Sequence, residues 1–460
     1  MTNLAKKVLE EDEQDSLVAK LLYSKNDMKE ICVSIIQEHR DDPNACQVRL
    51  INLLFRVVGG SSLSALGADT QLEDLGSDEW AQLITDLVDD MRYCAAEHVL
   101  ICADPNGAVV SKNTDNTPTA ASLGVREFRK MYQQFWLTLV DVALQEATGR
   151  FEIEMVRDWL NRIHELIEVS QPDIRAAAVV ASFQMSLGVL KRTVSLQTKY
   201  ETTLRQHKAA SSGGGSKKAE GLKNQLDALQ RSRQDLEEIV ESNFSTVFMN
   251  RYRDSNPFIR AENITALSQM TLLRPDLYCS GKYLKYIGWT LSDKAPCVRL
   301  ASVEGLSAPF HQEKNIDLSS IKNVVCKFLP RLADCTIDVN VQVQEKAMAL
   351  FLLLDRANFL EDFEDDSLWA QINNRALASD TSATVRRDAL YFIIDQLEAF
   401  DYDEAAEERG KKWSKDKNAS LMQSSDKTAA KKLGTLAGWY VICYVTFVLL
   451  VSPIRVYSHY

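Results

Sequence analysis

Aromatic and cationic side chains concentrate in two short stretches, in a pattern that suits recognition of a peptide. One stretch is residues 283–294 (YLKYIGWTLSDK), and the other is residues 251–254 (RYRD). Aromatic rings beside Arg and Lys offer contact area to an aromatic side chain of a peptide and positive charge to its carboxylates. The alternative is that Tyr283 and Trp289 pack between helices as ordinary core. Because Lys285 and Tyr286 would lie on another helical face, we expect part of this set to be exposed.

A second set of residues has the charge to contact nucleic acid. Residues 191–233 contain ten Lys or Arg and three Asp or Glu, a net charge of +7, whereas the whole chain carries −11. Clustered cations release counterions when they bind phosphates, so this stretch would bind duplex DNA without sequence preference. The alternative is a solvated helical surface with no ligand. The residues that we predict to contact DNA are Lys191, Arg192, Lys199, Arg205, Lys208, Lys217 and Lys218.

Residues for catalysis or for a cofactor show no known arrangement. The six His are dispersed, and neither an HExxH, a GxSxG, a GxGxxG nor a P-loop motif is present. The nine Cys include no CxxC pair, which argues against a zinc site and a disulfide framework and favours a reducing compartment. The N-terminal residues also lack the apolar core of a signal peptide. We therefore predict a protein that is not an enzyme, with no catalytic residue, no cofactor and no metal.

The elements that must position these residues are helices. The composition, 45% hydrophobic and 25% charged, is that of a folded protein. Apolar residues recur at three- and four-residue spacing along most of the chain, which predicts an almost entirely helical structure. We expect the aromatic members of such stripes to be core, because a helix needs an apolar stripe in order to pack. One stripe comprises Phe128, Tyr132, Phe135, Trp136, Leu139 and Val140.

A short repeated motif divides the second half of the chain. In copies that begin at Asp254, Asp293 and Asp380, the Asp is followed six residues later by an Arg that comes directly after an aliphatic residue. A weaker copy has Gln344 in place of the Arg, and an earlier relative ends in Arg175. The motifs of the second half end 39, 45 and 42 residues apart, which is typical of two-helix HEAT repeats. We expect the Asp to cap the second helix and the Arg to reach a carboxylate of a neighbouring repeat.

The repeat period is interrupted between residues 175 and 260. Leucines at helical spacing run up to the Gly- and Ser-rich residues 211–216 and away from them again, which predicts a long antiparallel helical hairpin. The basic stretch lies on this hairpin. The predicted fold class is therefore all-α: a HEAT-repeat α-solenoid with a projecting antiparallel helical hairpin.

The order of these features resembles the stromal-antigen (stromalin) subunit of cohesin. The stretches RYRD (251–254), YLKYIGWTLSDK (283–294) and VRL (298–300) follow one another as in the signature domain of that family. Before them come LINLLFRVVGG (50–60), VREFRKMYQQFW (125–136), the helical hairpin and VFMN (247–250), also in the family's order. The resemblance covers roughly residues 25–400.

The resemblance implies a hook-shaped HEAT solenoid that supports sister chromatid cohesion on chromatin in the nucleus. The implied partners are the kleisin and SMC subunits of cohesin, double-stranded DNA, and regulatory proteins with aromatic and acidic peptide motifs. In that family the peptide groove uses the positions that match Tyr252, Arg253, Lys285, Tyr286 and Trp289. The family's main kleisin-docking surface lies in a C-terminal half that these residues do not include.

The similarity ends near Asp401, and residues 436–451 (LAGWYVICYVTFVLLV) are almost wholly apolar. As a helix they would span about 24 Å, against about 30 Å for the hydrocarbon core of a bilayer. A C-terminal membrane anchor and a truncated gene model are both open interpretations. The alternative function is a generic HEAT adaptor tethered to a membrane, without DNA binding. The predicted divisions are an acidic N-terminal segment (1–20), an N-terminal helical region (21–192), the basic hairpin (193–243), HEAT repeats with the stromalin domain (244–405) and the tail (406–460).

Overall fold

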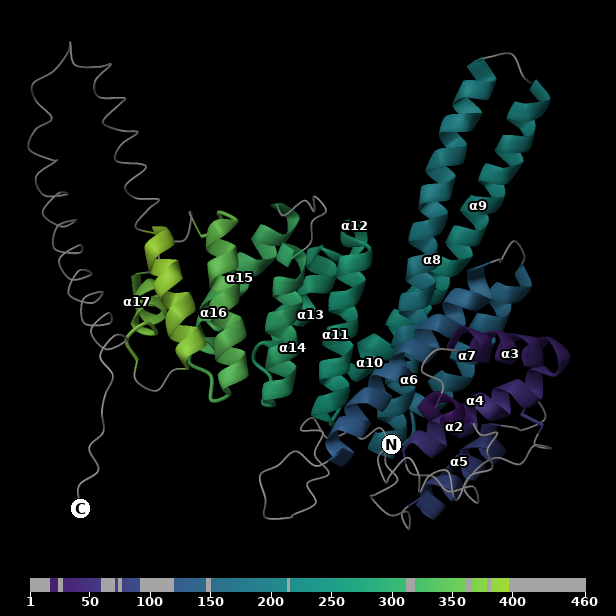
Figure 1. The fold of residues 1–460 in the computed structure, drawn as a ribbon, viewed down its shortest axis with the longest axis horizontal. Helices are drawn as coiled ribbons and strands as arrows, with labels where there is room; N and C mark the ends of the chain where they lie inside the picture. Colours follow the sequence, from purple (N-terminus) through teal and green to yellow (C-terminus); the bar gives the residue numbers. More distant parts are fainter. Residues whose placement is uncertain are drawn as a thin grey trace, which may run out of the picture. The chain divides into compact units, whose positions relative to one another are not determined.

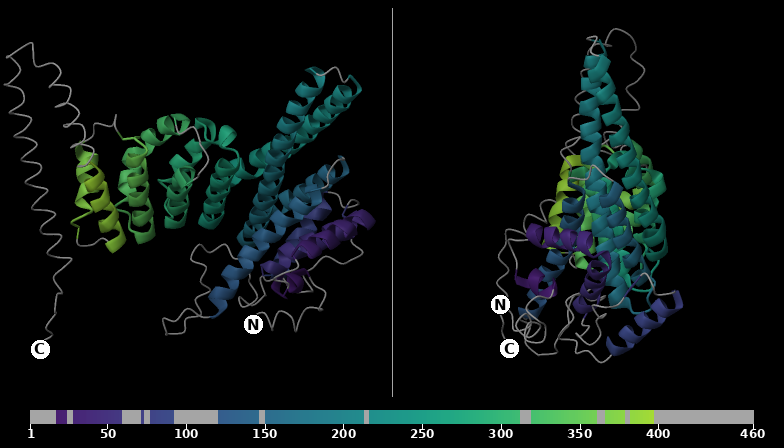
Figure 2. Two further views of the ribbon diagram at one scale, coloured as in Figure 1. Left: turned by 45° about the horizontal axis from the view of Figure 1, so that its top comes forward. Right: turned by 90° about the vertical axis from the view of Figure 1, so that its right-hand side faces the viewer.

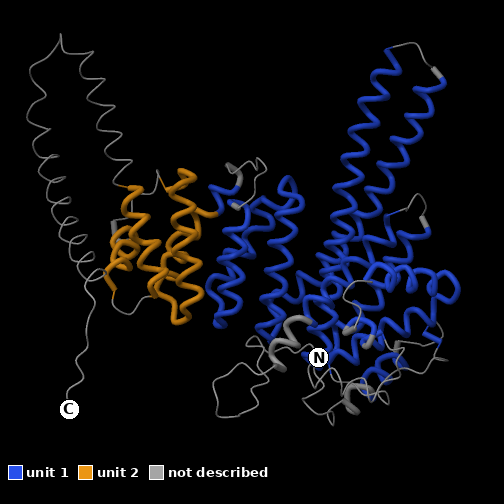
Figure 3. The backbone as a smooth tube through the Cα atoms, viewed as in Figure 1, with its two compact units in different colours: residues 1–324 blue, residues 325–460 orange. Residues whose placement is uncertain are grey.

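The computed structural model describes residues 17–23, 28–58, 71–72, 77–91, 120–145, 150–212, 216–311, 319–360, 366–378 and 382–396. The apolar segment 436–451 lies outside these residues. The chain forms two compact units, residues 1–324 and 325–460 (Figure 3). All regular secondary structure in the described ranges is helical, which confirms the predicted all-α class (Figure 1).

The N-terminal part of the first unit contains α2 (Leu17–Tyr23), α3 (Met28–Asp41), α4 (Pro43–Val57), α5 (Ser77–Met91), α6 (Ala120–Gln145) and α7 (Arg150–Ile167). The hairpin follows as α8 (Pro172–Ser212) and α9 (Ser216–Asn243), and a π-helical turn, η3 (Phe244–Phe248), joins α9 to α10 (Met249–Arg251). The repeats continue with α11 (Pro257–Leu273), α12 (Pro275–Tyr278), α13 (Gly281–Thr290), α14 (Pro296–Ser307) and the 3-10 turn η4 (Ala308–His311). Helix α15 (Ser319–Cys335) leads into the second unit, which holds α16 (Val341–Arg356), α17 (Asp366–Asn374) and a last helix over 383–396.

The aromatic stripe on α6 is core, as its spacing predicts. Phe128, Tyr132 and Trp136 are at most 1% exposed. The Tyr132 hydroxyl donates a hydrogen bond to the carbonyl of Ala177 on α8 (3.0 Å), so the polar end of this buried ring is satisfied. Close packing of α6 on α8 also depends on Gly188, because a Cβ there would lie 3.0 Å from the Cβ of Val140.

The predicted hairpin is present. Helices α8 and α9 lie side by side and project from the rest of the first unit (Figures 1 and 2). Buried Leu196, Leu226 and Leu236 form the seam between them, and Arg233 donates a hydrogen bond across it to Gln197. Within the described residues, α8 is the single helix with the length and hydropathy of a membrane span, and 89% of its apolar window is buried inside the protein. Its apolar character is therefore explained by core packing.

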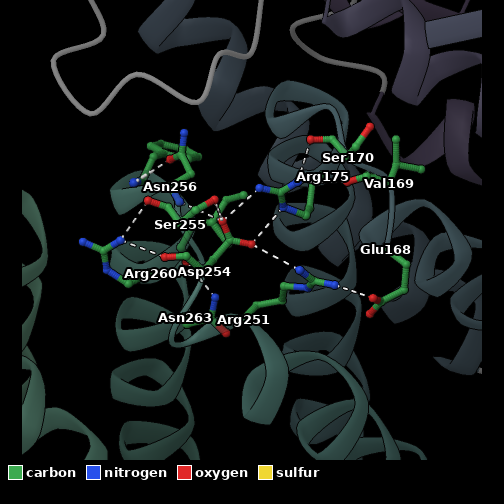
Figure 4. A network of polar contacts seen from close by, with 12 residues as sticks. Glu168, Val169, Ser170, Arg175, Arg251, Asp254, Ser255, Asn256, Arg260 and Asn263 are labelled. Atoms are coloured by element: carbon green, nitrogen blue, oxygen red, sulfur yellow. Dashed lines mark hydrogen bonds and ion pairs between the residues drawn. The ribbon is translucent and has the colours of Figure 1, made fainter.

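In the motifs that end in Arg175 and Arg260, the Arg joins consecutive repeats, as predicted, and Figure 4 shows the pair of Arg175 with Asp254. The Arg175 guanidinium donates to both carboxylate oxygens of Asp254 (2.8 and 3.0 Å), and Arg260 donates in the same way to Asp293 (2.8 and 2.7 Å). Each Arg also donates to backbone carbonyls five and six residues before it, for example Arg260 to Asp254 and Ser255. Each of these Arg side chains thus stabilises the turn before its own helix and also binds a carboxylate of a neighbouring repeat.

The prediction that the motif Asp caps the following helix is wrong. The helices begin after Asn256, Ala295 and Asn340, each of which lies two residues beyond the Asp. The carboxylate instead accepts the backbone N–H of that residue, at 2.8 Å in Asp254 and in Asp293. Such a bond closes an Asx turn, so the Asp orders the approach to the helix, and the two oxygens of the same carboxylate also accept from the Arg. Asp380 lies outside the described residues.

A half-buried acidic residue, Asp355, makes the second unit sensitive to pH. Burial raises the pKa of Asp355 to about 6, and the nearby carboxylate of Asp395 acts in the same direction, whereas Gln396 and Arg356 partly oppose them. A carboxyl whose folded-state pKa exceeds its unfolded value, about 3.9, contributes stability that is complete below the unfolded pKa and is lost as pH rises through the folded one.

Asp355→Asn should therefore stabilise the protein at pH 7.5 by about 1 kcal/mol, with little gain at pH 4.5. Thermal unfolding at the two pH values measures this difference. Asp334→Asn is the matched control, because Asp334 is exposed and pairs with Arg331 on its own helix (3.1 Å). An equal gain at both pH values would show that charge on Asp355 is not the cause.

Candidate functional site

The aromatic residues of the two predicted stretches meet between α10 and α13. We call Phe244, Phe248, Tyr252, Tyr286 and Trp289 the aromatic cluster. Phe244, Phe248 and Tyr252 stack in sequence along η3 and α10, with ring centroids 4.5 and 5.9 Å apart. Tyr286 on α13 meets Phe248 at 5.2 Å and Tyr252 at 5.0 Å, both edge to face. Trp289, one turn further along α13, lies 5.5 Å from Tyr286.

The aromatic residues of α13 are not exposed in the way that the sequence predicts. Tyr283 and Tyr286 are both buried, at 8% and 6% exposure, so Tyr286 forms the floor of the site. Trp289 is 50% exposed and offers the accessible ring. The expectation that Trp289 could be core is therefore wrong. The reason is that α13 packs residues 283, 284, 286, 287 and 290 inward, which leaves position 289 on its outer side.

Two cations lie over the rings of the cluster. The Arg253 guanidinium is 4.9 Å from the centroid of Tyr252. The Lys285 ammonium is 5.1 Å from the centroid of Tyr286 and 5.6 Å from that of Trp289. Arg253 is exposed and Lys285 is partly exposed, and in the described part of the chain neither forms an ion pair, so both charges are available to a carboxylate. The structure therefore brings together all five residues of the expected peptide groove.

The floor of the site includes residues that the sequence interpretation did not assign to it. Phe244 and Phe248 support Tyr286 from η3, and the Tyr286 hydroxyl lies 3.1 Å from the sulfur of Met249, which is 41% exposed. The signal was available as the four-residue spacing of Phe244, Phe248 and Tyr252. The spacing does not show that α13 packs against this face.

Beneath the cluster, a buried ion-pair network holds the turn after α10 (Figure 4). The side chain of Asp254 is 1% exposed, and it accepts from Arg175 and, at 3.4 Å, from Arg251. Burial alone would raise the pKa of Asp254, but hydrogen bonds from Arg175 and from the backbone N–H of Asn256 outweigh it and hold the pKa below its ordinary value. Arg251 also pairs with Glu168 at the end of α7. The backbone that carries Tyr252 and Arg253 is therefore firmly placed.

The predicted DNA-contacting residues line the hairpin. Lys191, Lys199, Arg205 and Lys208 on α8 and Lys217 and Lys218 on α9 are exposed. Arg192 differs, because it is half-buried, and burial lowers its pKa while Asp141 opposes that effect. Six of the seven cations are thus free to meet a phosphate, and Arg192 is the weakest candidate. No group of three or more His, Cys, Asp or Glu residues with metal-binding geometry occurs in the described ranges.

A family model matches the part of the aromatic cluster that lies on α13, and several proteins are similar to longer stretches of the chain. The model of the stromalin conservative domain matches residues 253–328, which include Arg253, Lys285, Tyr286 and Trp289. Cohesin subunit SA-3 of Mus musculus is 28% identical over 226 residues, which cover 46% of this chain and 18% of that protein. Cohesin subunit psc3 of Schizosaccharomyces pombe is 23% identical over 394 residues, or 84% of this chain and 38% of that protein. The chain spans well under half the length of these relatives.

The solved structure of cohesin subunit Scc3 from Z. rouxii (residues 88–1035) has the same fold. It superposes with a TM-score of 0.65 over 88% of this chain and 44% of that one, at 18% sequence identity. Together with the domain match, this superposition confirms the resemblance to stromalin-type cohesin subunits.

Proposed function

We propose that this chain works as a non-enzymatic subunit of a cohesin-type complex, supporting sister chromatid cohesion on chromatin in the nucleus. The observation that carries the proposal is the stromalin conservative domain at 253–328, which supplies Tyr286 and Trp289 of the aromatic cluster and its two cations, Arg253 and Lys285. Its proposed partners are the kleisin and SMC subunits of cohesin, duplex DNA and regulatory peptides.

Affinity purification of the tagged full chain from cells tests the complex. SMC and kleisin subunits should co-purify in a chromatin fraction after nuclease release. Recovery of the chain in membranes without these subunits would contradict the proposal and support a membrane-tethered adaptor.

The aromatic cluster is the proposed site for the regulatory peptides. Its accessible ring, Trp289, lies beside Lys285, while Arg253 covers Tyr252. A peptide with a Phe or Tyr near acidic residues would place its ring against the exposed indole and its carboxylates at the two cations. Because Tyr286 and the phenylalanines beneath it are buried, the floor is already formed and little order has to be created on binding.

Trp289→Ala should weaken such binding by about 2 kcal/mol, roughly 30-fold, because it removes the main contact surface. The measurement is fluorescence anisotropy with a labelled peptide of one Phe between two Asp–Glu pairs. Tyr391→Ala is the control, since Tyr391 is also an exposed aromatic residue (48%) but lies in the second unit. Unchanged affinity in folded Trp289→Ala would show that the indole does not bind peptide.

A further inference from the structure

The basic hairpin and the aromatic cluster share one helical rod. Helix α9, η3 and α10 follow one another without a break from Ser216 to Arg251. About 36 residues of helix correspond to roughly 54 Å. Lys217 and Lys218 lie at its far end, and the other five hairpin cations lie on α8, which packs along α9. Phe244, Phe248 and Tyr252 of the cluster lie at or next to its other end. Figure 1 shows α9 running from the far end of the hairpin down to α10.

One face of this rod contacts α13 and Arg274, the residue before α12, in a continuous series. Glu237 pairs with Arg274 (3.5 Å), and one turn later Glu241 pairs with Lys282 (3.6 Å). The series then becomes aromatic: Phe244 meets Tyr283 at 5.1 Å, and below it lie the contacts of Phe248 and Tyr252 with Tyr286. The cluster is the lowest part of this interface, so any rotation of the rod against α13 changes its geometry.

The opposite face of the rod is fixed to the N-terminal helices near its foot. Asn243 is fully buried and accepts hydrogen bonds from Ser182 and His164 through one oxygen, with His164 at 2.6 Å. Arg251 and Asp254 form the ion pairs to Glu168 and Arg175 described above. These bonds provide a pivot, because they restrain residues 243–254, whereas Lys217 and Lys218 lie at the other end of the rod.

The π-helical turn sets the register of the two faces. The N–H of Met249 bonds to the carbonyl of Phe244, five residues back, which places one extra residue in the turn. Without it, the residues that follow would rotate by about 100°. Tyr252 would then leave Tyr286, and Asp254 would leave Arg175. Such turns are rare and often occur at functional sites.

We propose that the hairpin acts as a lever on the aromatic cluster, so that duplex DNA bound to the hairpin weakens peptide binding at the cluster. This inference rests on the proposed function of both surfaces. We expect duplex DNA to weaken peptide binding, and not to strengthen it, because the rings and cations of the cluster are already assembled in the free protein. If bound DNA rotates the rod about residues 243–254, the rings of Phe248 and Tyr252 move away from Tyr286. By linkage, the peptide weakens DNA binding by the same factor.

The test measures both affinities of the full chain, each with and without the other ligand. The probes are a labelled 30-base-pair duplex and the labelled Phe peptide described above. Saturating duplex should weaken peptide binding by three- to tenfold, and saturating peptide should weaken duplex binding equally. A coupling factor of one, with both ligands bound, would overturn the lever.

A variant with a flexible rod, which we call the hinge variant, distinguishes coupling through the rod from direct competition of DNA and peptide for the same cations. Ser245 and Thr246 lie exposed in the π-helical turn, so Ser245→Gly/Thr246→Gly softens the rod without removing a cluster side chain. Both single-ligand affinities should persist while the coupling factor falls toward one. The control is Asn323→Gly/Lys327→Gly, which also introduces two glycines, here on the exposed face of α15, and should leave the coupling intact. Undiminished coupling in the hinge variant would overturn the lever in favour of charge competition.

Hydrogen exchange provides a readout that needs no peptide. Duplex binding should speed amide exchange in residues 281–290 of the wild type but not in the hinge variant. Unchanged exchange in the wild type with bound duplex would overturn the lever. Failure of the peptide to bind, with this exchange change present, would refute the peptide function and leave the lever supported. Failure of the duplex to bind would refute the DNA function and the lever with it.

Discussion

Asp254→Ala is expected to lower the free energy of unfolding of the first unit by about 3–5 kcal/mol, the largest effect of any single substitution considered. The Asp254 side chain is 1% exposed, and it is the carboxylate partner of Arg175, whose side chain is 8% exposed. Its removal leaves a buried guanidinium without its counter-charge and frees the turn that precedes α11. Denaturant unfolding followed by tryptophan fluorescence measures the loss, because Trp136 and Trp159 are buried in the first unit.

The matched control is the same substitution one repeat later. Asp293→Ala removes the equivalent partner of Arg260, but those side chains are 12% and 15% exposed, so water replaces part of the interaction and the loss should be smaller. Because the folded-state pKa of Asp254 is lowered, its contribution is present above the unfolded pKa and is lost as pH falls through the folded value. The difference between wild type and Asp254→Ala should therefore be constant from pH 6 to 8. A loss no greater than that of Asp293→Ala would contradict the assigned role of the buried pair.

Neutralising the hairpin cations should have the largest effect on DNA binding. The variant replaces Lys191, Arg192, Lys199, Arg205, Lys208, Lys217 and Lys218 by Gln. Each lost phosphate contact lowers the slope of log affinity against log salt by about 0.9. Since six of these residues are exposed and Arg192 is half-buried, the slope should fall by at most about 5–6. Sequence preference should not change, because these contacts are to the backbone of the duplex.

Mobility-shift titrations at two salt concentrations measure this slope for wild type and variant. The control neutralises seven cations of α15 and the second unit, which changes the net charge equally: Lys322, Lys327, Arg331, Lys346, Arg356, Arg386 and Arg387. A hairpin-specific interaction predicts a nearly unchanged slope in the control. Equal slopes for the wild type and the hairpin variant would show that the hairpin is a solvated surface and does not contact DNA.

The residues of the expected peptide groove lie close together in the structure, and peptide binding by them stays a prediction. Tyr252, Arg253, Lys285, Tyr286 and Trp289 were assigned through the family resemblance, and the structure brings them together. Their individual exposure was not predicted correctly. Helical spacing places residues on faces, but it does not show which face meets a neighbouring helix, and here the neighbour is η3, whose extra residue the sequence does not reveal.

The sequence by itself determined the helical class, the hairpin and the repeat motif, because these depend on local periodicity and on spacing along the chain. It also determined that an Arg would join neighbouring repeats, since a charge that recurs at a fixed position beside an apolar helix needs a recurring partner. The tertiary structure decided that Asp254 closes a turn and pairs with Arg175, 79 residues away, and that Trp289 rather than Tyr286 is the exposed ring. These outcomes depend on burial and on contacts between helices distant in sequence, whose geometry no local spacing contains.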